Sequence, residues 1–189
     1  MRDDSDPSGW QLLAADRLDE ASLTAAVIAA HRRILDELRR SDPLLNTALG
    51  IEVRAYRPLD DWRVLLLLTP WMLARLFVPQ QPPPIPIPPG WSASERRDAP
   101  YQVLGPALEI RLLDQPQRAH IHHDPDLGHY LLQPLCLDMT PYRDAEACFD
   151  AWAEVIRIRD ENMEQAQRDC PLQRDISRRE LFARILPRD

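Results

Sequence analysis

The residues with the clearest potential for chemistry are histidines gathered in one short stretch. Four of the five histidines lie within ten residues, with two aspartates among them: His120, His122, His123, Asp124, Asp126 and His129. Imidazole binds nickel, zinc and copper well. A metal site also needs ligands fixed in space, and the adjacent His122 and His123 diverge in a loop. We therefore expect a solvated His-rich loop over residues 114–127, with nickel handling as the alternative.

Catalytic arrangements are scarce in the rest of the chain. The sequence contains no G-x-S-x-G elbow, no Walker-type phosphate loop and no H-E-x-x-H zinc helix. Cys136 has no neighbour that would activate a nucleophile, and Asp60 and Asp61 are typical of a solvated turn. We therefore expect a protein that is not an enzyme and that uses no cofactor.

The three cysteines, Cys136, Cys148 and Cys170, are odd in number and widely spaced. This pattern favours reduced thiols over a disulfide framework. Because no C-x-x-C pair occurs, the sequence excludes a zinc ribbon or a rubredoxin-type iron site.

One segment combines a buried-strand pattern with large adaptable side chains. Residues 62–68 form a nearly continuous apolar run, which ends in Thr69-Pro70-Trp71-Met72. Tryptophan is a preferred anchor at interfaces, and methionine repacks around different ligands. Two readings carry equal weight: Trp71 and Met72 belong to the core, or they form an exposed binding platform.

Four strands are expected to position these residues. Alternating or continuous apolar patterns predict strands over 51–56, 62–68, 107–113 and 129–135. The first two are expected to pair antiparallel. Residues 71–77 fit either a short helix begun by Pro70 or further extended chain.

Helical periodicity occurs on both sides of these strands. From Ala21, apolar residues recur at steps of three and four, and the opposite face is expected to carry His31 and several arginines. A second helix is predicted to begin at Thr140-Pro141 and to run to about Gln167. The order helix, strands, helix predicts an α+β fold: an antiparallel sheet of about four strands, with N- and C-terminal helices packed on one face.

A single domain over residues 21–168 is expected between two tails. Residues 1–20 are acidic and turn-rich and predict a flexible tail, and residues 169–189 predict a C-terminal tail with a short helix over 177–186. Within the domain, residues 79–100 form a proline-rich crossover, because seven of the eleven positions from 79 to 89 are proline. Such a run favours a stiff surface spacer, with docking into a partner's aromatic groove as the alternative.

Composition limits the class of partner. The 23 basic residues are all arginine, and 30 acidic residues set the formal net charge at −7. Nucleic acid is therefore excluded as a natural partner, since phosphate binding needs a basic face. No apolar run approaches the roughly 20 residues needed to span a bilayer. We expect a cytoplasmic protein without membrane insertion, which binds a basic or neutral protein.

The segment from Trp62 to Pro79, with Thr69-Pro70-Trp71-Met72 at its centre, resembles the HybE/HupJ family of nickel-iron hydrogenase assembly chaperones. Two flanking segments support the resemblance. Gly105-Pro106 precedes an alternating strand, and residues 132–135 are similar to the Leu-x-Ser-Pro-Met/Leu segment of the family. The resemblance covers residues 21–165.

The chain departs from the family pattern in its proline run and its His-rich insert. His129 stands where a Cys is often found, and Gln133 replaces the usual Ser.

The resemblance implies a non-catalytic chaperone that binds a nickel-iron uptake hydrogenase subunit precursor, large or small, alongside other maturation proteins. Such a chaperone would prevent premature twin-arginine export of the precursor. Apolar contacts are expected to carry the binding. The expected partner-binding residues are Trp62, Thr69, Pro70, Trp71, Met72, Leu73 and Pro134.

Overall fold

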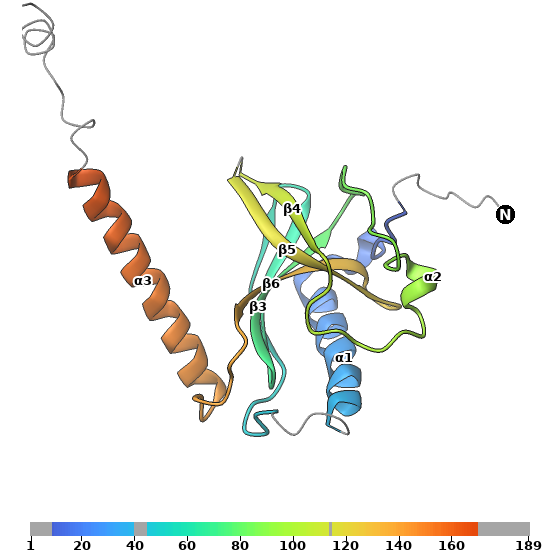
Figure 1. Cartoon of the computed structure of the whole chain (residues 1–189), viewed down its shortest axis with the longest axis horizontal. Helices are drawn as coiled ribbons and strands as arrows, with labels where there is room; N and C mark the ends of the chain where they lie inside the picture. The colour runs from blue at the N-terminus through green and yellow to red at the C-terminus, as the bar shows by residue number, and fades with distance from the viewer. Residues whose placement is uncertain (1–8, 40–44, 114, 170–189) are drawn as a thin grey trace, which may run out of the picture. The chain divides into compact units, whose positions relative to one another are not determined.

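The computed structural model describes residues 9–39, 45–113 and 115–169, with side chains through residue 162. Its elements, in chain order, are η1 (Ala15–Arg17), α1 (Glu20–Leu38), β1 (Glu52–Leu59), β2 (Trp62–Thr69), β3 (Met72–Pro79), α2 (Ala93–Arg96), β4 (Ala107–Leu112), β5 (Gln115–Asp124), β6 (Gly128–Cys136) and α3 (Ala145–Asp169) (Figure 1). The chain forms two compact units, Met1–Ala145 and Glu146–Asp189.

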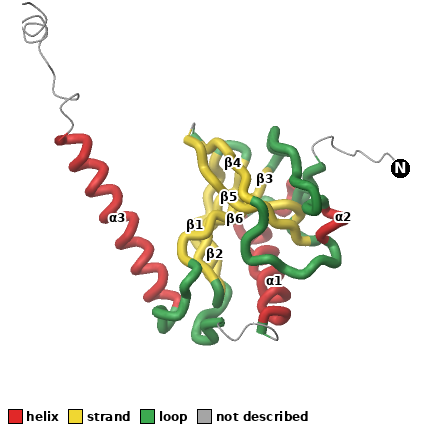
Figure 2. The backbone as a smooth tube through the Cα atoms, in the orientation of Figure 1, coloured by secondary structure: helices red, strands yellow, loops and turns green. Residues whose placement is uncertain are grey.

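The first unit is built on one antiparallel sheet with the strand order β1-β2-β3-β6-β5-β4. Two strand meanders therefore meet where β3 pairs with β6. A long connection carrying α2 joins β3 to β4 (Figure 2). The predicted α+β class with an antiparallel sheet is confirmed, and helices lie near both ends of the chain. The prediction of about four strands is wrong, because the sheet has six.

The two strands that the sequence did not assign are β3 and β5. Pro70 precedes a run of residues that are compatible with a helix, so the sequence allowed either a helix or a strand over 71–77. In the structure this segment is β3, which pairs with β2 in a hairpin. The expected His-rich loop is instead the ten-residue strand β5. Its period of two was obscured because histidines stand on both faces, and Ala119 and Ile121 are the only buried aliphatic residues in the strand.

Helix α1 packs against one face of the sheet (Figure 1). Asp19 caps it by accepting a hydrogen bond from the Ser22 amide, at 3.0 Å. The predicted apolar stripe is buried, and it includes Leu23 and Val27. His31 was expected on the polar face and is fully buried instead, because position 31 lies one turn after Val27 on the same stripe.

Two hydrophobic cores lie on the two faces of the sheet. The α1-side core joins α1 to inward residues of the sheet, such as Leu67 and Leu132. The far-side core joins Val64 and Leu131 to aromatic residues from outside the sheet. Neighbouring strand residues point to opposite faces, so β2 contributes to both cores.

The far-side core is covered by two segments without helix or strand. Trp10 is 5% exposed, and its indole N–H donates to the Ile85 carbonyl at 2.7 Å. Ile85 and Ile87 of the proline-rich segment pack against the same core. The proline run is thus a cover for the second face of the sheet as well as a crossover. Within the described part of the segment predicted to be a flexible tail, Trp10 and Leu13 are buried.

A β-bulge changes the inward face of β1. Ala55 has φ +55°, and the pairing register with β2 shifts between Arg54 and Arg57. After the bulge Tyr56 reaches the α1-side core, and its hydroxyl donates to the Leu18 carbonyl at 2.8 Å. The sequence pattern placed Ala55 inward, whereas it is exposed.

The described part of the second unit is helix α3. The helix begins at Ala145, later than the predicted start at Thr140-Pro141. Arg157 pairs with Glu154 and Glu161 one turn away on either side. In the residues that the structure describes, no helix is long and apolar enough to cross a membrane. The predicted short helix over 177–186 lies outside the described residues.

Candidate functional site

Two regions compete as the functional site: the Thr69–Met72 corner and a polar pocket beside α1. The corner is the two-residue turn that joins β2 to β3, with Thr69 paired to Met72. The Thr69 hydroxyl donates to the Met72 carbonyl at 3.0 Å and accepts from the Met72 amide at 3.0 Å. The hydroxyl therefore closes the turn from inside, which explains a threonine before Pro-Trp-Met.

The corner is sealed within the protein. Trp71 is 7% exposed and Met72 is fully buried in the α1-side core. Of the two readings of these side chains, the structure supports the core reading, and the expectation of an exposed platform is wrong. Their burial follows from their place at the sheet end that α1 covers.

The seven expected partner-binding residues do not share one surface. Trp62 lies in the far-side core, on the face opposite to Trp71. Thr69, Pro70 and Leu73 are buried as well, while Pro134 is half-buried on β6. Trp62 thus lies in one core and Trp71 and Met72 in the other, so the seven residues do not form a common binding face.

Asn46 ties the corner to the segment that follows β6. Its amide N–H donates to the Pro70 carbonyl at 3.1 Å. Its side-chain amide donates to the Met139 and Tyr142 carbonyls, both at 2.7 Å. The corner therefore positions the loop between β6 and α3, where Leu137 is 49% exposed.

A closed ring of five aromatic side chains lies between α1 and the sheet. Each ring contacts the next, with centroids 5.5 to 6.4 Å apart, in the order His31, Trp71, Tyr101, His122, Tyr130 and back to His31. These residues come from α1, the β2–β3 turn, the segment before β4, β5 and β6. The ring explains how a strand rich in histidine is accommodated in a core.

Four members of this ring carry a buried polar atom without a hydrogen-bond partner: His31 Nε2, Trp71 Nε1, Tyr101 Oη and His122 Nε2. Burial raises the pKa of Tyr101, and the nearby Trp71 indole opposes this effect. The indole and the hydroxyl do not, however, meet the geometry of a hydrogen bond. An unpaired buried polar atom costs about 1–3 kcal/mol. Such a concentration of unpaired atoms points to a function beyond packing.

Burial keeps the ring uncharged. Desolvation lowers the pKa of His31 to about 4 and that of His122 to about 3, and it raises the pKa of Tyr101 well above its ordinary value. Arg96 also disfavours the charged form of His122. At neutral pH these groups are neutral hydrogen-bonding partners, with neither an acid nor a base poised for proton transfer.

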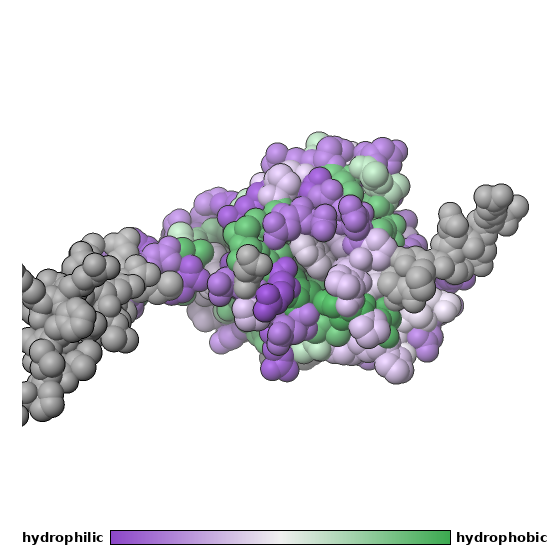
Figure 3. Space-filling view, turned by 90° about the horizontal axis from the view of Figure 1, so that it is seen from above, coloured by the Kyte–Doolittle hydropathy of each residue, from purple (hydrophilic) through white to green (hydrophobic). Residues whose placement is uncertain are grey.

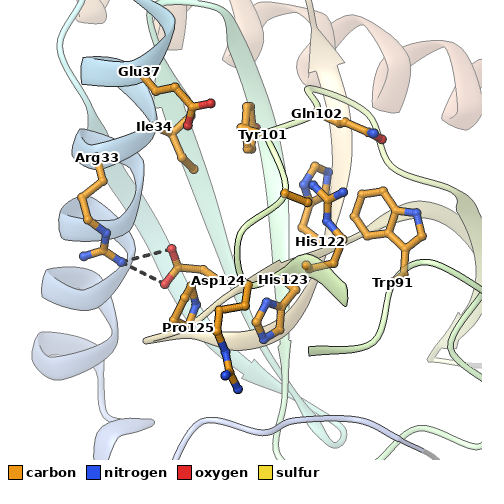
Figure 4. A pocket seen from close by; sticks show the side chains of 13 residues that line it. Arg33, Ile34, Glu37, Trp91, Tyr101, Gln102, His122, His123, Asp124 and Pro125 are labelled. Atoms are coloured by element: carbon orange, nitrogen blue, oxygen red, sulfur yellow. Dashed lines mark hydrogen bonds and ion pairs between the residues drawn. The ribbon is translucent and has the colours of Figure 1, made fainter. Parts of the chain in front are cut away.

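Two members of the ring, Tyr101 and His122, line a pocket of about 250 Å³. In Figure 4, Arg33 and Glu37 project from α1 on one side, Trp91 and His122 lie on the other, and Tyr101 stands between them. The pocket mouth is polar, because the charged side chains of α1 and α2 surround it.

An ion pair fixes the α1 side of the pocket. Arg33 Nη2 lies 3.0 and 3.1 Å from the two carboxylate oxygens of Asp124 and 2.8 Å from Asp126 (Figure 4). The Asp124 side chain is 10% exposed and also accepts from the amides of Asp126 and Leu127. Asp124 is therefore fully engaged in holding α1 against the β5–β6 turn.

The opposite side of the pocket is built on α2. Ser92 and Glu95 form a capping box, and the Arg96 guanidinium lies 4.4 Å from the centroid of the Trp91 ring. Arg96 also donates to the Pro100 carbonyl at 2.7 Å. Its orientation is thus set by an aromatic face and a carbonyl, and no carboxylate in the described part of the chain forms an ion pair with it.

Two of the remaining three histidines hold the N-terminal segment, and the third, His120, bonds the Gly105 carbonyl at 2.6 Å. His129 Nδ1 accepts from the Gln11 amide at 2.7 Å, and its Nε2 donates to the Trp91 carbonyl at 3.0 Å. His123 Nε2 bonds the Gln11 side chain at 2.8 Å. Gly128, at φ +71°, lies so near Gln11 that a Cβ atom would meet its carbonyl oxygen at 2.3 Å.

The histidine cluster divides between the two faces of β5. His122 and His123 alternate along the strand, so His122 joins the aromatic ring while His123 lies beside His129, with ring centroids 4.8 Å apart and the rings tilted by 56°. Across the described ranges, no three His, Cys, Asp or Glu side chains gather in a way that could hold a metal ion. Cys136, the candidate nucleophile, donates to the Asp138 carbonyl at 3.2 Å.

Comparison with known proteins identifies the family. The model of the family described as "[NiFe]-hydrogenase assembly, chaperone, HybE" matches residues 22–184. The chain belongs to the HybE family. This confirms the resemblance seen in the sequence, and the description of the family is that of an assembly chaperone.

A solved structure is also similar to this HybE family member. It is the solution structure of HybE from Escherichia coli, with a TM-score of 0.41 and 18% sequence identity, covering 61% of this chain and 63% of that chain. The chain therefore spans less than two thirds of that HybE structure. A search of curated proteins finds no match.

Several pocket residues escaped the sequence reading of this HybE chain. Trp91 and Arg96 lie in the stretch 79–100, which was predicted to be a proline-rich crossover, and Tyr101 directly follows it. The capping-box pattern from Ser92 to Glu95 was a readable sign of a short helix there. No pattern linked that helix to His122, because the pocket forms only when α1 and β5 meet it.

Proposed function

We propose that this HybE family member holds a nickel-iron hydrogenase subunit precursor in a non-covalent complex while the subunit matures in the cytoplasm. The observation that carries this proposal is the family match over residues 22–184. An assembly chaperone acts by reversible binding. The hydrogen-bonding groups of the pocket are buried and neutral, which suits reversible binding of a partner better than catalysis.

The proposal includes control of export. Twin-arginine signals are basic, and this chain has a net charge of −7, which favours encounter with a basic segment. A precursor held by the chaperone would be kept from the export machinery until maturation ends. This effect predicts binding that weakens as ionic strength rises.

We propose that the precursor contacts the end of the sheet beside the Thr69–Met72 corner, with the corner as its support. Leu137 is the large apolar side chain exposed there, at 49%. Figure 3 shows a different face of the molecule, on which hydrophilic and hydrophobic side chains are interspersed. Because single exposed leucines are common on protein surfaces, the role of Leu137 is tested by substitution.

Co-purification tests both parts. Tagged protein is expressed with the large or the small subunit precursor, and recovery of the precursor is measured for wild type and Leu137→Glu. Loss of one buried leucine contact predicts about tenfold weaker binding. Leu113→Glu is the matched control, because Leu113 is 65% exposed and its amide donates to Asp60, in the β1–β2 turn at the opposite end of β2 from the corner.

The outcomes separate the two parts. Equal recovery with Leu137→Glu and wild type would remove the proposed contact and leave the chaperone function. Failure of wild type to retain either precursor would overturn the function itself.

A further inference from the structure

We propose that the pocket beside α1 binds a carboxylate group of the polypeptide that the chaperone holds, with Tyr101 and His122 as hydrogen-bond donors and Arg96 as the opposing charge. This inference rests on the proposed function and adds the chemistry of one contact. Three independent features support it: unpaired buried donors, unneutralised arginines and the size of the pocket.

Two buried side chains that line the pocket each have a polar atom without a hydrogen-bond partner. His122 is 2% exposed, and its Nε2 atom and the Tyr101 hydroxyl both lack a hydrogen bond. Both residues line the pocket. A neutral imidazole can carry its proton on Nε2, so both groups can donate to the same acceptor. Hydrogen bonds to a charged acceptor are about twice as strong as neutral ones, which favours a carboxylate over an amide.

The charge on the α2 side favours an anion. Arg96 and Arg97 both line the pocket, and among the described residues no carboxylate forms an ion pair with either. Two acidic residues also line the pocket: Asp124 is engaged by Arg33, and Glu37, like Arg97, is exposed to solvent. Arg96 is therefore the half-buried charge of the lining that no described carboxylate pairs with. An entering carboxylate would therefore find an arginine at the rim and two donors below it.

The size of the pocket limits the guest to one functional group. A volume of about 250 Å³ is below the range of about 300–1,000 Å³ that is usual for whole small-molecule ligands. It suits the end of one side chain or of one polypeptide. A cation is disfavoured by Arg96 and Arg97, and the neutral ring offers no charge to hold it.

Titration with model compounds tests the pocket directly. The full-length isotope-labelled protein is titrated by NMR with N-acetyl-glutamate amide, which carries a side-chain carboxylate, and with its isomer N-acetyl-glutamine, which carries a terminal carboxylate. N-acetyl-glutamine amide is the neutral control. We expect saturable shifts of the Trp71 and Trp91 indole N–H signals with at least one acid, and at least tenfold weaker binding of the neutral amide.

Two variants locate the binding. Tyr101→Phe and Arg96→Gln are each expected to weaken carboxylate binding about tenfold or more. Arg111→Gln is the matched control, because Arg111 lies on β4, outside the pocket, and its loss changes the net charge equally. An unchanged spectrum away from the pocket shows that each variant is folded.

Three results would overturn the inference: no saturable shift with either acid, equal shifts with the neutral amide, or binding that survives both pocket variants. Binding of the side-chain acid or of the terminal acid identifies the source of the carboxylate, and either supports the pocket.

Precursor co-purification separates this inference from the proposed function. If the wild type retains a precursor but binds no carboxylate, the pocket proposal fails and the chaperone function stands. If the wild type binds carboxylate but retains no precursor, the proposed function fails while the pocket keeps its ligand chemistry. Tyr101→Phe should reduce retention as well as acid binding when both proposals hold.

Discussion

The Thr69–Met72 corner and the pocket beside α1 share Trp71, yet they treat polar atoms in opposite ways. In the corner, the one buried hydroxyl has its hydrogen bonds satisfied by the turn that it closes. In the pocket and its aromatic ring, imidazole and phenol atoms are buried without partners. The first pattern is what folding stability requires, whereas the second costs stability and is retained where a ligand can supply the missing bonds.

This contrast teaches that the most recognisable segment of a family need not be its contact surface. The Thr-Pro-Trp-Met segment, which carried the family resemblance in the sequence, forms a tight turn at a buried sheet end. A binding pocket assembled from α1, α2 and β5 leaves no comparable signature in any one segment. The predictions below test whether the two regions differ in this way.

The largest effect is expected for Trp71→Ala. The side chain is 7% exposed in the α1-side core, so its truncation leaves a cavity and should lower the free energy of unfolding by about 3–5 kcal/mol. Urea unfolding followed by circular dichroism measures the change. Leu113→Ala, at a 65% exposed position, is the control and should stay within about 0.5 kcal/mol. A small loss for Trp71→Ala would contradict its place in the core.

Acid should destabilise the ring before it affects the corner. Burial lowers the pKa of His31 to about 4 and of His122 to about 3, below the ordinary value of 6.5. The unfolded chain therefore binds more protons, so the stabilisation is complete above pH 6.5 and declines as the pH falls toward 4. Well below pH 6.5, each histidine lowers the free energy of unfolding by about 1.4 kcal/mol for each unit by which the pH falls. The two together lower it by about 2.7 kcal/mol per unit.

Unfolding free energies at pH 7, 6 and 5 measure this dependence. His31→Gln keeps a neutral donor for the Val27 carbonyl, which His31 Nδ1 contacts at 2.9 Å, and should remove about half of the pair's slope. An unchanged slope in that variant would show that His31 is not buried in its neutral form.

Much of the fold was predictable, because α1, β2 and β4 have strong apolar periodicity and turn residues at their ends. The prediction failed where a polar side chain is buried by tertiary contacts. His31 and His122 read as surface residues in the sequence, and only the aromatic ring that assembles from five segments makes them core residues. The pocket was unpredictable for the same reason, since Tyr101 and Arg96 acquire their roles only beside β5.

Thr69→Val tests the satisfied polar atom of the corner. The substitution keeps the shape of the side chain and removes the hydroxyl, which leaves the Met72 amide and carbonyl without their partner. We expect a loss of about 1–3 kcal/mol in the free energy of unfolding. Thr69→Ser retains the hydroxyl and should lose less. Equal losses for the two variants would indicate that packing of the methyl group, rather than hydrogen bonding, holds the turn.

Tyr101→Phe is the counterpart in the pocket and should have the smallest effect on stability. The hydroxyl removed here has no hydrogen-bond partner, so its loss relieves a desolvation cost instead of breaking a bond. The free energy of unfolding should stay unchanged or rise by up to about 1 kcal/mol. If Thr69→Val lowers the stability and Tyr101→Phe does not, the Tyr101 hydroxyl serves a purpose other than folding. A loss above about 1 kcal/mol would instead place an unseen structural bond at Tyr101 and make the two regions alike.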